Sequence, residues 1–254
     1  MWRLFRWTAL LLVVTGAATA AGYAGLRTGR LFERNLLCCD IPPEHNLRIS
    51  VREALGLLQF PSQIGQDRWV AEKVFPGVRD GYFVDVGSGH GFTDSNTWSL
   101  EQRGWTGICI DPFPGNMDGR TCQMFQQVVG SVAGQQVTFV KAGALGGISD
   151  HLGRWKSHTD DAETVELTTT TLGDVLRRAG APSYIHFVSL DIEGAELEAL
   201  RGFPFDRYSV GSFAIEHNLE EPKRTQVDQL LRERGYERVR TWLQDDFYLP
   251  RPRR

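Results

Sequence analysis

The residues best suited to chemistry are carboxylates that stand directly after apolar stretches. Asp85 ends one such stretch and is followed by a turn that contains Gly87, Gly89 and Gly91. A ligand can lie against the backbone of this turn, since glycine has no Cβ and tolerates a positive φ. Dinucleotide sites need G-x-G-x-x-G, but Phe92 stands in place of the third glycine, and Asp85 would repel a pyrophosphate. The turn therefore favours a ligand with an ammonium group and no phosphate, such as S-adenosylmethionine (SAM).

Asp111 is a second carboxylate at the end of an apolar stretch, residues 105–110. It lies 20 residues after Gly91, the offset at which an acid binds the hydroxyls of a ribose. The alternative is an aspartate that only caps a turn before Pro112. In the first interpretation, Asp111 holds the adenosine part of the ligand.

Two further apolar stretches also end in polar groups. These groups are Asp191, Glu193 and Glu196 after residues 185–190, and Glu216, His217 and Asn218 after residues 210–215. Nearly continuous apolar runs are typical of central parallel strands, whose carboxyl ends carry the ligand sites of α/β proteins. Glu193 and Glu196 have an alternative interpretation, because acids also stabilise the N-terminus of the helix expected there.

Strands and helices alternate along the chain, which predicts an α/β fold with a mostly parallel sheet. The predicted strands cover residues 81–85, 105–111, 124–129, 136–140, 185–190, 210–215, 236–241 and 247–249, and the predicted helices cover residues 68–74, 93–103, 172–179, 193–200 and 222–234. The last two strands are expected to form an antiparallel hairpin. Residues 143–161 are polar and irregular, and we expect them to form a substrate lid.

The composition and the cysteine spacing argue against nucleic acid and zinc as ligands. The net charge of −3 leaves no electrostatic footprint for nucleic acid. No cysteine spacing indicates a disulfide scaffold or a zinc site. Cys109 and Cys122 fall in or near predicted strands and are expected to be buried thiols.

The amino-terminal stretch, residues 7–26, carries no charge and is long enough to cross a bilayer. We expect a single-pass membrane anchor within residues 1–30, a linker at 31–60 and one catalytic domain at 61–254. A cleaved signal peptide, with a site near Ala18-Thr19-Ala20, is the alternative and would give a secreted or lumenal protein. Basic residues flank the stretch on both sides, so the orientation stays open.

The region from Ser62 to Pro250 resembles the FkbM family of SAM-dependent methyltransferases. The matching motifs are Ser62-Gln63-x-Gly65-Gln66-Asp67, Phe83-Val84-Asp85-Val86-Gly87, Ser95-Asn96-Thr97, Gly104-Trp105-x-Gly107-Ile108, Leu190-Asp191-Ile192-Glu193-Gly194-Ala195-Glu196, Ile215-Glu216-His217-Asn218, Gly235-Tyr236 and Asp246-Phe247-Tyr248. One departure is Asp111, where the family often has glutamate. The resemblance implies a Rossmann-like class I methyltransferase fold, with a seven-stranded sheet, helices on both faces and O-methylation of a sugar or other small-molecule or glycan hydroxyl.

The resemblance also assigns roles to individual residues. The expected cofactor-binding residues are Gln66, Asp85, Gly87, Gly89, Gly91, Ser95, Asn96, Asp111 and Asp191. The acceptor hydroxyl needs a base or a metal, because an alcohol does not ionise at neutral pH. His217 is the expected base, with Asp191 and Glu193 near the transferred methyl group. The competing hypothesis is Mg²⁺ held by Asp191, Glu216 and Asn218, which would lower the hydroxyl pKa.

Two other functions remain open at this point. One is a catalytically silent methyltransferase-like module on a membrane, and the other is an NAD-dependent oxidoreductase. Uptake of SAM or of NAD separates them. Neither the acceptor nor the oligomeric state follows from the sequence.

Overall fold

The structure is a computed structural model that describes residues 60–252. The predicted membrane anchor and nearly all of the predicted linker therefore lie outside the described residues. Within residues 60–252, every helix is too short or too polar to span a bilayer.

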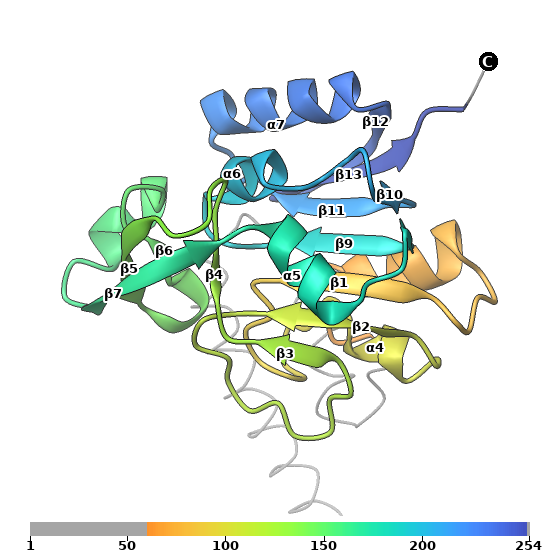
Figure 1. Cartoon of the computed structure of the whole chain (residues 1–254), viewed down its shortest axis with the longest axis horizontal. Coiled ribbons are helices and arrows are strands. Elements are labelled where there is room, and N and C mark those ends of the chain that lie inside the picture. The colour runs from red at the N-terminus through yellow and green to blue at the C-terminus, as the bar shows by residue number, and fades with distance from the viewer. Residues whose placement is uncertain (1–59, 253–254) are drawn as a thin grey trace, which may run out of the picture. The chain divides into compact units, whose positions relative to one another are not determined.

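The centre of the domain is a seven-stranded sheet in the order β12-β13-β11-β9-β1-β2-β3 (Figure 1). Its strands are β1 (Tyr82–Val86), β2 (Thr106–Ile110), β3 (Gln123–Phe125), β9 (Phe187–Leu190), β11 (Phe213–Glu216), β12 (Tyr236–Trp242) and β13 (Asp245–Pro250). Neighbouring strands pair in parallel along the part of the sheet formed by β11, β9, β1, β2 and β3. Strand β13 runs antiparallel to both of its neighbours, β11 and β12. The predicted α/β fold with a mostly parallel sheet and a closing hairpin is confirmed.

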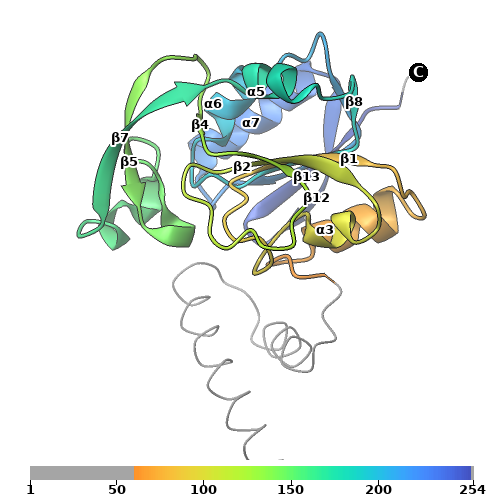
Figure 2. The ribbon, with the colours of Figure 1, turned by 60° about the horizontal axis from the view of Figure 1, so that its bottom comes forward.

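Helices cover both faces of this sheet (Figure 2). On one face lie α5 (Leu172–Ala179), α6 (Glu196–Arg201) and α7 (Glu221–Glu233); on the other lie α3 (Gln66–Trp69), a π-helical turn (Val70–Val74) and α4 (Trp98–Glu101). Side chains alternate between the faces along each strand. Ile215 and Tyr248 pack on the α7 face, whereas Phe83, Ala214 and Phe247 pack on the α3 face.

A second, four-stranded sheet in the order β4-β7-β5-β6 is inserted between β3 and α5. It contains β4 (Val128–Val129), β5 (Gln136–Lys141), β6 (Gly147–Ile148) and β7 (Glu163–Thr170), and lies to one side of the central sheet (Figure 1). Short 3₁₀ helices at Gly143–Leu145 and Gly153–His158 fill the stretch expected to be irregular. Strand β7 was not expected from the sequence. A small parallel pair, β8 (Tyr184–Ile185) and β10 (Ser209–Val210), flanks the central sheet.

Two predicted elements were too long. The helix expected at residues 93–103 is only α4, since Asp94 has a left-handed φ of 58° and the Ser95 hydroxyl accepts the N–H groups of Thr97 and Trp98. These contacts delay the start of the helix. The strand expected at residues 124–129 divides into β3 and β4, because Gln127 bonds back to Phe125.

Cys109 and Cys122 form a disulfide, so the prediction of two free buried thiols was wrong. Cys109 lies on β2 and Cys122 immediately precedes β3, and these strands are neighbours. Their Cα atoms are 5.8 Å apart, within the range that a disulfide needs. The bond closes the loop that follows Asp111.

Removing this disulfide is expected to lower the free energy of unfolding by about 3 kcal/mol, the entropy of closing a loop of this length in the unfolded chain. The two cysteines are 13 residues apart. Urea denaturation of Cys109→Ala/Cys122→Ala beside the unchanged protein measures the difference. The disulfide would be contradicted by two results together. The variant and the unchanged protein would be equally stable, and the unchanged protein, unfolded without reductant, would show two more free thiols than the variant.

Candidate functional site

The candidate site lies at the carboxyl ends of β1, β2, β9 and β11. The chain order reverses beside β1, because β2 lies on one side of it and β9 on the other. Ligands of doubly wound sheets bind at such a switch point. The predicted groups Asp85, Asp111, Asp191 and Glu216 all stand at these strand ends.

The glycine turn after β1 offers open backbone to a ligand. Gly87 and Gly89 have left-handed φ values of 80° and 53°. A Cβ on Gly87 would lie 1.7 Å from the Asp191 carbonyl oxygen, so the turn packs directly against the end of β9. A Cβ on Gly89 would meet no described atom nearer than 3.9 Å. Gly91 packs against the loop after β2, where a Cβ would lie 2.5 Å from the Asn116 oxygen.

Asp111 lies beside this turn. Its Oδ2 accepts the N–H of Gly89 at 2.9 Å, and its Oδ1 accepts the N–H of Phe113 at 2.8 Å. Burial raises the pKa of this carboxyl. Asp111 therefore joins the glycine turn to the loop after β2, as the turn-capping alternative expects. Its contact with a cofactor stays a prediction.

Asp85 is enclosed beneath the turn. Thr97 donates its hydroxyl to Asp85 Oδ2 at 2.5 Å, and Arg120 donates to the Thr97 oxygen at 2.7 Å. Burial raises the pKa of Asp85 to about 6. Arg120 also donates to Ser95 and pairs with Glu101 at 2.9 Å. Asp85 and Ser95 thus hold the framework of the turn, a role that the sequence did not separate from cofactor contact.

The remaining predicted cofactor residues, Asn96 and Gln66, lie on the α3 face of the sheet. Asn96 donates to the Ser189 hydroxyl at 2.9 Å, and its own Oδ1 is buried without a partner in the described part of the chain. Gln66 donates to Asp245 Oδ2 at 2.9 Å. Gln66 therefore contacts an acid at the end of the sheet.

Three carboxylates gather beyond β9 and β11: Asp191, Glu193 and Glu216, here called the acid cluster. One oxygen of each lies within 4.8 Å of the others. Asn218 donates to Glu193 at 2.9 Å and to Glu216 at 2.8 Å, so its amide N–H₂ faces the cluster. Glu193 and Asn218 adopt left-handed φ values of 55° and 48°, which is unusual for residues other than glycine. The backbone is thus bent to bring these groups together.

The charged groups that most affect Asp191 and Glu216 are other acids. Among residues 60–252, no basic side chain forms an ion pair with Asp191 or Glu216. Burial raises the pKa of Asp191 and raises that of Glu216 well above its ordinary value, and the charge of Asp191 adds to the effect on Glu216. A side-chain hydrogen bond with Glu216 opposes the shift in the pKa of Asp191. Both shifts favour the protonated form of an acid in this cluster.

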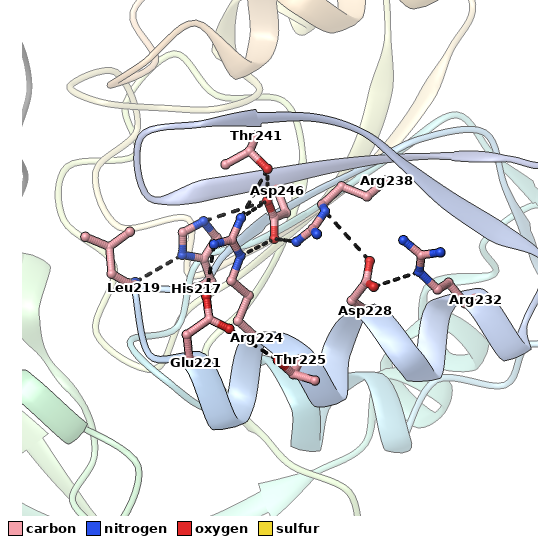
Figure 3. A network of polar contacts seen from close by, with 10 residues as sticks. All are labelled: His217, Leu219, Glu221, Arg224, Thr225, Asp228, Arg232, Arg238, Thr241 and Asp246. Atoms are coloured by element: carbon pink, nitrogen blue, oxygen red, sulfur yellow. Dashed lines mark hydrogen bonds and ion pairs between the residues drawn. The ribbon is translucent and has the colours of Figure 1, made fainter.

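His217 lies elsewhere. Ile215 and His217 are on the α7 face, whereas Glu216 between them points to the α3 face with Ala214. Figure 3 shows His217 beside Arg224 and Asp246. Its Nδ1 accepts the Leu219 N–H at 3.0 Å, and its Nε2 is 3.8 Å from Asp246 Oδ1.

This environment does not suit a base. Burial lowers the pKa of His217 to about 4, although the charge of Asp246 opposes the shift. Asp246 is itself bound by Arg224, Arg238 and Thr241. The expectation that His217 removes the acceptor proton stays a prediction, and the structure buries this side chain beside Asp246.

The second sheet borders the acid cluster. A Cβ on Gly147 of β6 would lie 3.3 Å from Glu193 Cβ. Arg154 donates to the Asn218 carbonyl at 3.2 Å, and Lys223 donates to the His151 carbonyl at 2.5 Å. The segment predicted as a lid is thus packed against the loops that carry the cluster.

Sequence reasoning missed Asp245, the first residue of β13. It pairs in register with Glu216 and is only 3% exposed. Burial raises its pKa well above the ordinary value, and Asp191 adds to the shift. The sequence gives little indication of this position, because the register of β13 against β11 decides whether Asp245 or Asp246 lies beside Glu216.

The sheet order, the antiparallel β13 and the glycine turn after β1 together define a Rossmann-like fold of the methyltransferase class. Residues 85–238 match the family described as the methyltransferase FkbM domain. The chain therefore belongs to the FkbM methyltransferase family. No curated protein matches it in a sequence comparison.

Proposed function

We propose that this protein is a SAM-dependent O-methyltransferase acting on a hydroxyl of a sugar, or of another small-molecule or glycan acceptor. One observation carries the proposal: Asp191 joins the open glycine turn to the acid cluster. Its carbonyl packs against Gly87, its N–H bonds to Val86, and its carboxylate lies with Glu193 and Glu216. In this proposal, Asp191 thus borders the space for the cofactor with its backbone and accepts the proton with its side chain.

The residues present fit SAM. The uncovered backbone at Gly89 supplies room, and Asp111 supplies carboxylate oxygens beside it. When bound, SAM would supply an electrophilic methyl group on a sulfonium. The chain must then orient the acceptor oxygen and remove its proton. Asp191 is the base in this proposal, because it stands between the turn and the cluster and has no basic partner among the described residues.

Location is a separate part of the proposal. We infer a protein attached to a membrane through residues 7–26, with its catalytic domain in an oxidising compartment. The uncharged stretch supports the attachment, and the disulfide supports the compartment, because disulfides persist where thiols are not kept reduced. A cleaved signal peptide would give the same compartment without the attachment.

The acceptor class is tested with methyl-labelled SAM and a panel of glycosides and polyols, each beside its per-O-methylated counterpart. Label is expected only in products from acceptors with free hydroxyls, and it should resist mild alkali, as ethers do and esters do not. Transfer to amines or carboxylates alone would overturn the O-methylation. NAD-linked turnover, or no transfer with no SAM binding, would favour the oxidoreductase or the silent module.

Gly89→Ala is expected to weaken binding of S-adenosylhomocysteine at least about tenfold, equivalent to about 1.4 kcal/mol. The added methyl would project into the space left for the cofactor. Gly180→Ala is the matched control, because Gly180 also has a left-handed φ (65°) and open surroundings, but it ends α5. Both variants should lose stability to a similar extent, about 1–2 kcal/mol. Equal affinity in the two variants would remove the turn from the cofactor site.

His217→Asn is expected to leave turnover within about threefold while lowering the free energy of unfolding by about 1–3 kcal/mol. Asparagine retains an acceptor for the Leu219 N–H but fills less of the buried space. Steady-state rates and urea denaturation measure the two effects. A loss of about 100-fold or more in a folded variant would restore His217 as the base.

A further inference from the structure

We propose that the acid cluster binds one divalent cation, magnesium or manganese, through the carboxylates of Asp191, Glu193 and Glu216. Carboxylate oxygens are the ligands that these hard cations prefer. The assignment differs from the one predicted from sequence, because Glu193 replaces Asn218 as a ligand.

The spacing of the three carboxylates suits a single small ion. Their oxygens lie within 4.8 Å of one another. Ligands 2.0–2.1 Å from an octahedral ion are about 3 Å apart when adjacent and about 4.2 Å apart when opposite. The oxygens can be more widely spaced than this, and side-chain rotations that move each of them by up to about 1 Å would bring all three groups to one centre. Asn218 directs its N–H₂ at two of them, which positions these carboxylates but offers no ligand oxygen in this orientation.

Asp245 is an independent indication of a missing positive partner. It pairs in register with Glu216 across β11 and β13, so both side chains leave the same face of the sheet. It is 3% exposed, and Gln66 binds its Oδ2. Its Oδ1 is buried with no partner in residues 60–252. A buried carboxylate oxygen without a donor is costly. A cation beside Glu216, or water bound to that cation, would satisfy it.

The neighbouring Asp246 shows how the fold treats an acid that needs no external cation. It points to the α7 face, where Arg224 binds it at 2.8 Å and Arg238 at 2.9 Å. Across the sheet, neither Asp191, Glu216 nor Asp245 forms an ion pair with a described basic residue. Within residues 60–252, arginines therefore neutralise Asp246 on one side of this strand end, whereas Asp191, Glu216 and Asp245 on the other side have no such ion pair.

The role of the cation rests on the proposed function, whereas its binding does not. A divalent ion next to Asp191 would lower the pKa of an acceptor hydroxyl coordinated to it. It would also favour acceptors that present two neighbouring oxygens, such as vicinal diols, because both oxygens can coordinate. The proton of the hydroxyl would still leave to a carboxylate or to water. The acceptor oxygen would bond to the methyl carbon as the carbon–sulfur bond of the sulfonium breaks, which releases S-adenosylhomocysteine.

Mn²⁺ titration of the full chain, followed by electron paramagnetic resonance at neutral pH without SAM, tests the site. One ion is expected to bind with a Kd of about 10⁻³ M or tighter, in competition with Mg²⁺. Glu193→Gln and Glu216→Gln should each weaken binding at least about tenfold, and Asp245→Asn about tenfold. Glu198→Gln is the matched control, since this nearby acid pairs with Arg201 on α6.

Circular dichroism establishes that each variant is folded. No Mn²⁺ binding by the unchanged protein, or equal binding by the control and by both cluster variants, would overturn the cation site. S-adenosylhomocysteine binding is measured in the same samples, so that loss of the cation site alone is distinguished from failure of the proposed function.

Discussion

Asp191→Asn is expected to lower the turnover of methyl transfer by about 10²–10⁴-fold, the usual contribution of a positioned base. The substitution keeps the size of the side chain and the backbone contacts with Gly87 and Val86. It removes the carboxylate that lies with Glu193 and Glu216. Turnover is measured with saturating SAM and acceptor. S-adenosylhomocysteine affinity should change much less, because the variant retains the packing of the turn.

Glu198→Gln serves as the control for loss of a nearby acid. Its carboxylate pairs with Arg201 and lies on α6, outside the cluster. Turnover in this variant should match that of the unchanged protein. If Asp191→Asn turns over at the control rate while folded, Asp191 is neither the base nor a ligand to an essential cation.

Asp111→Ala is expected to weaken S-adenosylhomocysteine binding by about 1–3 kcal/mol, or about 5–150-fold. The variant loses the charged acceptor that binds the N–H groups of Gly89 and Phe113, and with it the oxygens available to a ribose. Calorimetric titration measures the affinity directly. Turnover at saturating SAM should fall less than affinity does.

Two further substitutions sharpen this result. Asp111→Glu keeps a carboxylate at the end of β2 and is expected to retain most of the affinity. Asp118→Ala removes an exposed acid from the same loop and should have no effect. Equal affinity in Asp111→Ala and Asp118→Ala would exclude Asp111 from the cofactor site.

The central sheet was largely predictable because its strands are continuously apolar. Strands β1, β2, β9 and β11 each read as a short apolar run with a polar end, as expected of parallel strands covered on both faces. The position of Asp111 directly after β2 was also predicted, whereas its contact with Gly89 was not. Strand β7 was missed, because it lies in an inserted sheet that has little apolar signal.

The contacts at the site that the sequence did not reveal have one physical origin, the pairing of distant strands. Alternation along β11 implies that Glu216 and His217 point to opposite faces, but the sequence does not say which face holds the cofactor. The register of β13 against β11 places Asp245, rather than Asp246, beside Glu216. The disulfide likewise depends on the adjacency of β2 and β3. None of these relations is local in sequence.

The most direct test of a SAM site at the glycine turn is calorimetric titration of the full chain with S-adenosylhomocysteine, repeated on Gly89→Ala and Gly180→Ala. We expect one site with a Kd on the order of micromolar. Affinity should fall at least about tenfold in Gly89→Ala and stay unchanged in Gly180→Ala. No binding by the unchanged protein, or equal binding by both variants, would contradict a SAM site at the glycine turn.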